Sequence, residues 1–195
     1  MIEIKEVVNS VLNSKTYILT KVGNVNAWLV DIGDIKPVVT FLKEQRLSVE
    51  GVLLTHGHFD HFYGLSSLMN HYPSCNVYAT EYTKKVLASD EMNLSKPNNR
   101  SIAYEGDNII LVKEGDEVKL FDDEPVAHIY EVPGHNPGCM ALVMSDIIFT
   151  GDAYIPGLGV KDFVPYADKA QAKQSMERLI ILAEGKTIFP GHQIV

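Results

Sequence analysis

The sequence predicts an α/β sandwich in which β-sheets are bracketed by helices in both halves of the chain. Two observations support this fold class. Strand-like apolar runs alternate with segments of helical periodicity from one end of the chain to the other. No low-complexity segment or Ser/Gly-rich linker interrupts the 195 residues, a length typical of one domain. We therefore expect a single domain over residues 1–195.

The first elements are two strands and a helix. Residues 16–20 and 27–31 are rich in β-branched and aromatic side chains, and Gly23-Asn24 between them is typical of a turn. A helix follows, with Asp34 as its N-cap and Pro37 in its first turn. Its apolar face consists of Ile35, Val38, Val39 and Leu42.

The middle of the chain continues this alternation. The apolar run 51–55 predicts a buried strand, residues 77–79 a second strand, and residues 80–87 a short capped helix. Between the strands lies a helix that Pro73 ends. The residues with helical spacing in it are Leu65, Leu68, Met69 and Tyr72. The polar segment 92–100 is expected to be a surface loop.

The second half predicts strands followed by one long helix and a final strand. Residues 101–150 are mainly strand-like, with a hairpin expected around residues 114–116. A helix over residues 168–183 stops at Gly185. Its apolar side is formed by Ala172, Met176, Leu179, Ile180 and Ala183. A last strand is expected at residues 186–189.

Composition and charge argue against several classes of protein. No apolar run approaches the roughly 18 residues of a membrane span, so we expect a cytoplasmic protein without a membrane partner. Seventeen basic against 25 acidic residues give a net charge of -8, which argues against nucleic acid as a partner. Cys75 and Cys139 form no disulfide framework, and we expect both to be reduced thiols.

The segment that indicates chemistry is Thr-His-Gly-His-Phe-Asp-His at residues 55–61. It holds three of the seven histidines within six residues, beside an aspartate. Because side chains two apart in an extended segment point to the same side, His56 and His58 can share one metal ion. Asp60 and His61, at the turn into the next helix, are free to face a second ion. Imidazole and carboxylate are the ligands expected for zinc, iron or manganese.

Three more strand ends carry a candidate ligand. Two strands end in the same Pro-Gly-His triplet, which leaves His135 and His192 at the rim of the sheet. The apolar strand 147–150 delivers Asp152 after a glycine. Sites in layered α/β folds gather where strands end, so these residues extend the predicted metal site. The loop 154–163 follows Asp152 directly and is expected to form a wall of the cleft.

In order and spacing, these motifs resemble those of the metallo-β-lactamase superfamily over essentially the whole chain. The resemblance implies an αββα sandwich of two mixed β-sheets flanked by helices, with a dinuclear metal site at the edge of the packed sheets. It implies one ion held by His56, His58 and His135, a second held by Asp60, His61 and His192, and Asp152 as the bridging ligand. The two divalent ions would be zinc, with iron or manganese as alternatives. Asp60 and Asp152 are also candidate catalytic proton acceptors.

Within this superfamily, the run 133–139 is similar to the Pro-Gly-His-Thr-Pro-Gly-Ser run of the hydroxyacylglutathione hydrolases (glyoxalase II). Asn136 and Cys139 are its two departures. This resemblance implies a metal-dependent hydrolase in which a hydroxide bound by two metal ions attacks a small thioester, ester or lactone. Glyoxalase II uses a helical C-terminal extension to bind glutathione, whereas the sequence ends three residues after His192. Glutathione recognition therefore stays open.

Three alternatives to this hydrolase stay open from the sequence. A mononuclear iron persulfide dioxygenase would share part of the ligand pattern and leave the second site unfilled. The shared residues are His56, His58, His135 and Asp152. A phosphodiesterase of the same fold and a binding protein whose site no longer turns over are the other two. In each case the expected partner is a small molecule. The sequence does not indicate an oligomeric state.

Overall fold

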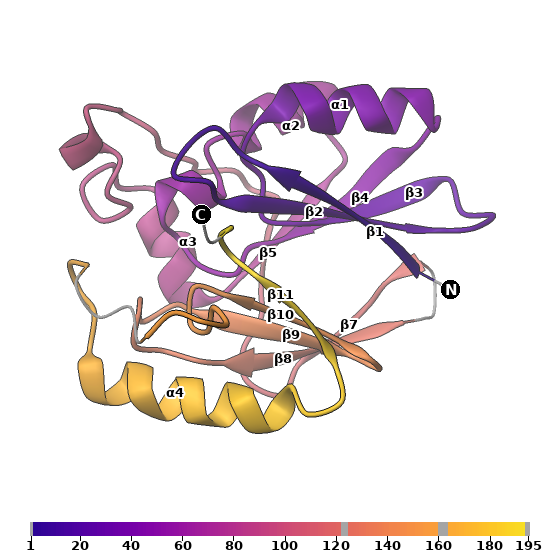
Figure 1. The fold of residues 1–195 in the computed structure, drawn as a ribbon. Helices are drawn as coiled ribbons and strands as arrows, with labels where there is room; N and C mark the ends of the chain where they lie inside the picture. Colours follow the sequence, from indigo (N-terminus) through magenta and orange to yellow (C-terminus); the bar gives the residue numbers. More distant parts are fainter. Residues whose placement is uncertain (1, 122–124, 160–163, 194–195) are drawn as a thin grey trace.

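The computed structural model describes residues 2–121, 125–159 and 164–193. In this part of the chain two mixed β-sheets pack face to face, and helices cover the outer face of each sheet (Figure 1). The predicted α/β class and the αββα sandwich are confirmed. One domain over residues 1–195 stays a prediction.

The first sheet follows the order of the chain. Its strands are β1 (Ile2–Val8), β2 (Lys15–Lys21), β3 (Asn26–Val30), β4 (Ser48–Leu53), β5 (Asn76–Ala79) and β6 (Ile109–Leu111). β1 to β3 pair antiparallel, whereas β3 to β6 pair in parallel. Parallel neighbours need a crossover connection. The helices α1 (Ile35–Glu44), α2 (Leu65–His71) and α3 (Glu81–Leu87) lie in these crossovers.

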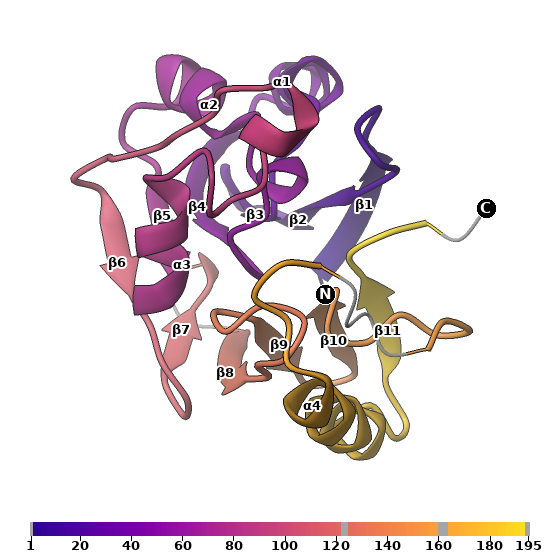
Figure 2. The ribbon, with the colours of Figure 1, turned by 90° about the vertical axis from the view of Figure 1, so that its left-hand side faces the viewer.

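The second sheet has the order β11-β10-β9-β8-β7. Its strands are β7 (Glu117–Lys119), β8 (Val126–Glu131), β9 (Met140–Met144), β10 (Ile147–Gly151) and β11 (Thr187–Pro190). β7 to β10 pair antiparallel, and β11 lies parallel to β10. The long helix α4 (Lys169–Leu182) connects these last two strands and covers the outer face of the sheet (Figure 2).

The sandwich contains three apolar layers because side chains alternate along the central strands. On β2, Ile18 packs under the helices of the first sheet, whereas Leu19 packs between the two sheets. On β10, Phe149 packs between the sheets and Ile148 packs against α4. Strands buried on both faces are continuous apolar runs, which is the pattern that the sequence shows.

The predicted helices are confirmed, with local differences. Asp168 caps α4 by accepting a hydrogen bond from the Gln171 amide at 2.9 Å. Asp34 precedes α1 as predicted, but its carboxylate does not cap that helix. On α4, Ile180 is 44% exposed, so its predicted place on the buried side is wrong. No helix among the described residues has the length and apolar character needed to cross a bilayer.

Two features of the sheets differ from the expectation. The predicted hairpin around residues 114–116 is wrong, because β6 and β7 on either side of it belong to different sheets. The chain crosses there from one layer to the other. The strand β1 was not predicted, because charged residues at Glu3, Lys5 and Glu6 interrupt its apolar pattern. These side chains are exposed, which an edge strand permits.

Candidate metal centre

The seven predicted ligands come together at one end of the sandwich. The short 3-10 helix η1 (Phe59–His61) and the residues before it follow β4 and carry the first four ligands. The other three follow the ends of β8, β10 and β11. Their donor atoms fall into three overlapping groups, each within 4.8 Å: His56, His58 and His135; His56, His61 and Asp152; Asp60, His61 and His192. The structure therefore gathers every residue of the predicted site.

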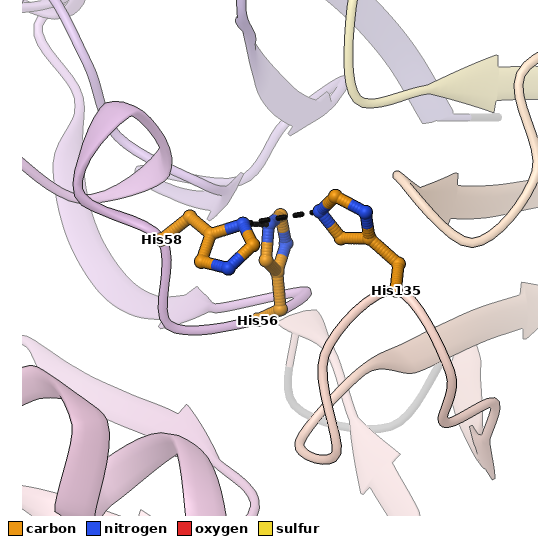
Figure 3. A group of neighbouring side chains, drawn as sticks. All are labelled: His56, His58 and His135. Atoms are coloured by element: carbon orange, nitrogen blue, oxygen red, sulfur yellow. Dashed lines mark hydrogen bonds between the residues drawn. The ribbon is translucent and has the colours of Figure 1, made fainter. Parts of the chain in front are cut away.

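Three buried imidazoles form the first group (Figure 3). The Nδ1 atom of His58 lies 3.1 Å from Nε2 of His56 and 3.0 Å from Nε2 of His135. The three rings come from two segments that are far apart in sequence and converge on these nitrogens. Each nitrogen offers one lone pair when the proton is on the other ring atom.

Asp60, His61 and His192 form the second group. The remaining set of His56, His61 and Asp152 shares one histidine with each of these two groups. The Nε2 atoms of the two histidines are 3.2 Å apart. The Oδ2 atom of Asp60 lies 3.4 Å from Nε2 of His61 and 3.3 Å from Nε2 of His192. The His192 side chain is 12% exposed, whereas all three histidines of the first group are buried, so the second group lies nearer the solvent.

Asp152 lies between the two groups. Its Oδ2 atom is 3.5 Å from Nε2 of His135 in the first group and 3.2 Å from Nε2 of His192 in the second. Its Oδ1 atom is 3.6 Å from Nε2 of His61. A carboxylate that reaches members of both groups has the position that a bridging ligand requires.

The donor set fits divalent metal ions. Ligands about 2.0–2.1 Å from one tetrahedral zinc ion lie roughly 3–4 Å apart. Five of the six donor–donor distances within the two groups are 3.0–3.4 Å, and the sixth, between His56 and His135, is within 4.8 Å. Imidazole nitrogens and carboxylate oxygens are the ligands of zinc and also of iron and manganese. The chemistry and the spacing of the residues agree with the predicted pair of sites.

The buried charges of the centre shift its pKa values strongly. Burial lowers the pKa of His61, but the charges of Asp60, Asp31 and Asp152 outweigh burial and raise this pKa to about 9. Burial, together with the neighbouring histidines, holds the pKa of His56 well below its ordinary value. Burial would raise the pKa of Asp152, but the histidines around its carboxylate hold it well below the usual range. The centre thus contains anions that favour a cation among them.

Asp31 contacts the site and was missed by the sequence analysis. Its Oδ2 atom accepts a hydrogen bond from Nδ1 of His61 at 2.8 Å and another from the Thr55 hydroxyl at 2.8 Å. The Thr55 oxygen in turn lies 3.1 Å from Nδ1 of His56 and can accept its proton. This chain of hydrogen bonds leaves Nε2 of both histidines to a metal ion. The signal available in the sequence was an aspartate directly after the apolar run 27–30. In the structure Asp31 has a left-handed φ of 56°.

The two Pro-Gly-His turns use glycine for different reasons. Gly134 has a φ of 134°, and a Cβ atom there would overlap the backbone of Ala172 on α4. A Cβ atom at Gly191 would collide with the Asp152 carboxylate. The turn before His135 therefore needs the backbone freedom of glycine, and the turn before His192 needs its small size.

Other residues near the site have structural contacts. The Tyr63 hydroxyl donates to Asp34 at 2.6 Å and so points toward the start of α1. Asn136, the first departure from the glyoxalase II pattern, accepts from the Gly138 amide at 2.9 Å and places its own amide 3.4 Å from Nε2 of His58. Both cysteines are free and buried, as expected. Residues 160–163 of the predicted cleft wall lie outside the described residues.

Comparisons with known proteins agree with this geometry. Residues 25–192 match the family model of the metallo-beta-lactamase superfamily. A hydroxyacylglutathione hydrolase from Photobacterium profundum is 32% identical over 169 residues, which are 85% of this chain and 56% of that protein. The chain therefore spans about half the length of the curated relatives that it matches.

Solved structures share the fold. The B3 metallo-beta-lactamase BLEG-1 has a TM-score of 0.88 at 21% identity, covering 98% of this chain and 92% of that one. The protein TTHA1623, solved in a di-iron-bound form, has a TM-score of 0.82 at 23% identity, covering 97% and 92% of the two chains. At these identities the likeness establishes the fold alone.

Proposed function

Because the chain belongs to the metallo-β-lactamase superfamily, we propose that it is a metal-dependent hydrolase acting on a small thioester, ester or lactone. The observation that carries the proposal is the place of Asp152, whose carboxylate reaches one histidine of each ligand group within 3.5 Å. A single ion held by three histidines would not need a second histidine and carboxylate pair beside it. The site is therefore proposed to be dinuclear.

In the proposed centre, His56, His58 and His135 would hold one ion. Asp60, His61 and His192 would hold the other, and Asp152 would serve both. When bound, two divalent ions supply an activated water molecule and polarise the carbonyl group that it attacks. We propose zinc for both positions, with iron or manganese as alternatives. The di-iron form of the structural neighbour TTHA1623 supports iron as one alternative.

The residues of this chain have distinct tasks in that reaction. Asp31 and Thr55 hold the rings of His61 and His56 in place. We propose Asp60 and Asp152 chiefly as ligands, because the histidines around Asp152 hold its pKa well below the usual range and make it a weak proton acceptor. Cys139 is excluded as the nucleophile, because burial and the nearby Asp152 charge raise its pKa and keep the thiol protonated.

The hydroxyacylglutathione hydrolase relatives support a thioester as the substrate. Two divalent ions carry more positive charge than Asp60 and Asp152 neutralise, so the centre favours an electron-rich acyl oxygen. Binding of the glutathione part is a separate question, because the relatives extend well beyond the matched region. We therefore propose the thioester class, with or without a glutathione moiety.

A panel of substrates tests this proposal. Zinc-loaded protein is expected to hydrolyse a glutathione thioester or a glutathione-free thioester at least about 100-fold faster than bis(p-nitrophenyl) phosphate, and a chelator should abolish the activity. The matched control is His128→Ala, which removes an exposed histidine paired with Glu117 on β7. It should retain full activity. Faster phosphodiester cleavage, or oxygen uptake with glutathione persulfide by iron-loaded protein, would reject acyl hydrolysis.

A further inference from the structure

The two ligand groups are supported by different parts of the chain. In the first group, His56 and His58 contact Thr55 and Asn136, which lie close to the ligands in sequence. In the second group, Asp60 and His192 both contact one distant segment, the β1–β2 loop, defined here as residues 9–14. Figure 1 shows this loop near the end of the yellow segment that follows β11, and Ser14 forms a β-bridge with His192 there.

The β1–β2 loop contacts Asp60 and His192 through two hydrogen bonds. The Ser14 hydroxyl donates to the backbone carbonyl of Asp60 at 2.7 Å. The Leu12 carbonyl accepts from Nδ1 of His192 at 2.9 Å. Because a carbonyl can only accept, this contact keeps the proton on Nδ1 and leaves Nε2 of His192 as a ligand atom. The loop thereby fixes the backbone position of Asp60 and the tautomer of His192.

The loop also holds the segment that carries His192. The Gln193 amide donates to the Asn13 carbonyl of the loop at 3.0 Å, and the amide of Lys15, the first residue of β2, donates to the Gly191 carbonyl at 2.8 Å. Ser14 and His192 form an antiparallel bridge between these bonds. A ligand near the end of the described chain is therefore fixed by backbone pairing to the loop.

The conformation of the loop is costly and is braced from inside. Leu12 and Asn13 both have a φ of 54°, a left-handed conformation that is unfavourable for leucine. The buried Asn9 side chain donates to the Ser14 hydroxyl at 3.2 Å and accepts from the Asp34 amide at 2.9 Å. Such strain persists only where surrounding contacts enforce it, and it often marks a functional segment. Here it directs the Leu12 carbonyl at His192.

We propose that the β1–β2 loop is a clamp for the second metal ion, with Ser14 and the Leu12 backbone as its positioning groups. The inference rests on the proposed dinuclear site and adds what controls its occupancy. When the loop is in place, Asp60 and His192 face His61 and the second ion is held. When the loop is displaced, the first group stays intact and the centre becomes mononuclear.

Two pairs of variants of the full chain test the clamp by zinc titration against a competing chelator. Leu12→Pro cannot adopt a φ of 54° and should misdirect the carbonyl, whereas Leu12→Gly favours that conformation. Ser14→Ala removes the hydroxyl that holds Asp60. Its control is Ser10→Ala, which removes the hydroxyl of an exposed serine in the same loop. That hydroxyl donates a hydrogen bond to the Asp34 carboxylate. Circular dichroism and urea unfolding verify that each variant folds.

The expected result is selective. Leu12→Pro and Ser14→Ala should lower the affinity for the second zinc ion by about 10-fold or more. The affinity for the first zinc ion should not change, because both variants alter contacts of the second group alone. Leu12→Gly and Ser10→Ala should bind both ions as the wild type does. Wild-type affinities in all four variants would overturn the clamp and leave the proposed hydrolase intact. An equal loss of affinity for both zinc ions would also overturn the clamp. A wild-type protein that takes up only one ion would refute the dinuclear site itself, and the clamp with it.

Discussion

Replacing Asp152 with alanine is expected to abolish turnover and to lower the metal content from two ions per chain to one. The Asp152 carboxylate is the group that reaches His135 and His192 together. In the proposed dinuclear centre its loss would remove a ligand from both sites at once and leave the two ligand groups without the carboxylate between them. Metal catalysis contributes several kcal/mol, so the rate should fall on the order of a thousandfold or more. Steady-state kinetics and elemental analysis of the same preparation check both effects.

Two further variants distinguish the loss of the Asp152 charge from a general effect on the fold. Asp146→Ala removes an exposed aspartate before the other end of β10, whose carboxylate accepts only from the neighbouring Ser145 hydroxyl among the described contacts. It should keep full activity and two ions. Asp152→Asn retains the shape of the side chain and removes its charge, so it should behave like the alanine variant. Full activity in Asp152→Ala would show that the reaction does not use this centre.

The stability of the metal-free protein is expected to fall as the pH rises from 6.5 to above 9. The folded protein holds a proton on His61 with a pKa of about 9, whereas the unfolded chain loses it near the ordinary value of 6.5. The stabilisation from this proton is complete below pH 6.5 and is lost as the pH rises through 9. It amounts to roughly 3 kcal/mol. Urea unfolding in the presence of a chelator at several pH values measures it.

Zinc should reverse the direction of this pH dependence. The proton and the ion compete for Nε2 of His61, the atom that faces His192 at 3.2 Å. Raising the pH removes the competing proton and strengthens metal binding, so the zinc-loaded protein should gain stability over the same range. Asp31→Asn removes one of the charges that raise the pKa of His61 and should flatten the slope of the metal-free protein. Parallel slopes with and without zinc would contradict this account of the centre.

The sequence was sufficient to predict which side chains come together, because four of them lie in one short segment after β4 and the other three follow the ends of β8, β10 and β11. A Pro-Gly-His triplet or an apolar run followed by Gly-Asp marks such a place without knowledge of the partners. The apolar runs in β4 and β10 likewise indicated strands buried on both faces, which only a layered fold provides. Local patterns thus contained both the class of the fold and the positions of the chemical groups.

The parts that could not be predicted depend on contacts between distant segments. The turn at Gly115 has the local chemistry of a hairpin, but the adjoining strands pair in different sheets. The carboxylate of Asp31 acts on His61, 30 residues away. The β1–β2 loop meets His192 across most of the chain, and no pattern in either segment specifies the other. Such pairings are decided by packing of the whole sandwich.

The most direct test of the dinuclear centre is elemental analysis of wild-type protein, first purified without added metal and then supplied with zinc, iron or manganese. The seven side chains that converge at the end of the sandwich predict two ions per chain. Two ions of one of these metals would support the hydrolase. A single iron ion, with the second position empty even after metal is supplied, would contradict it and point to an oxygen-dependent reaction at the three-histidine group.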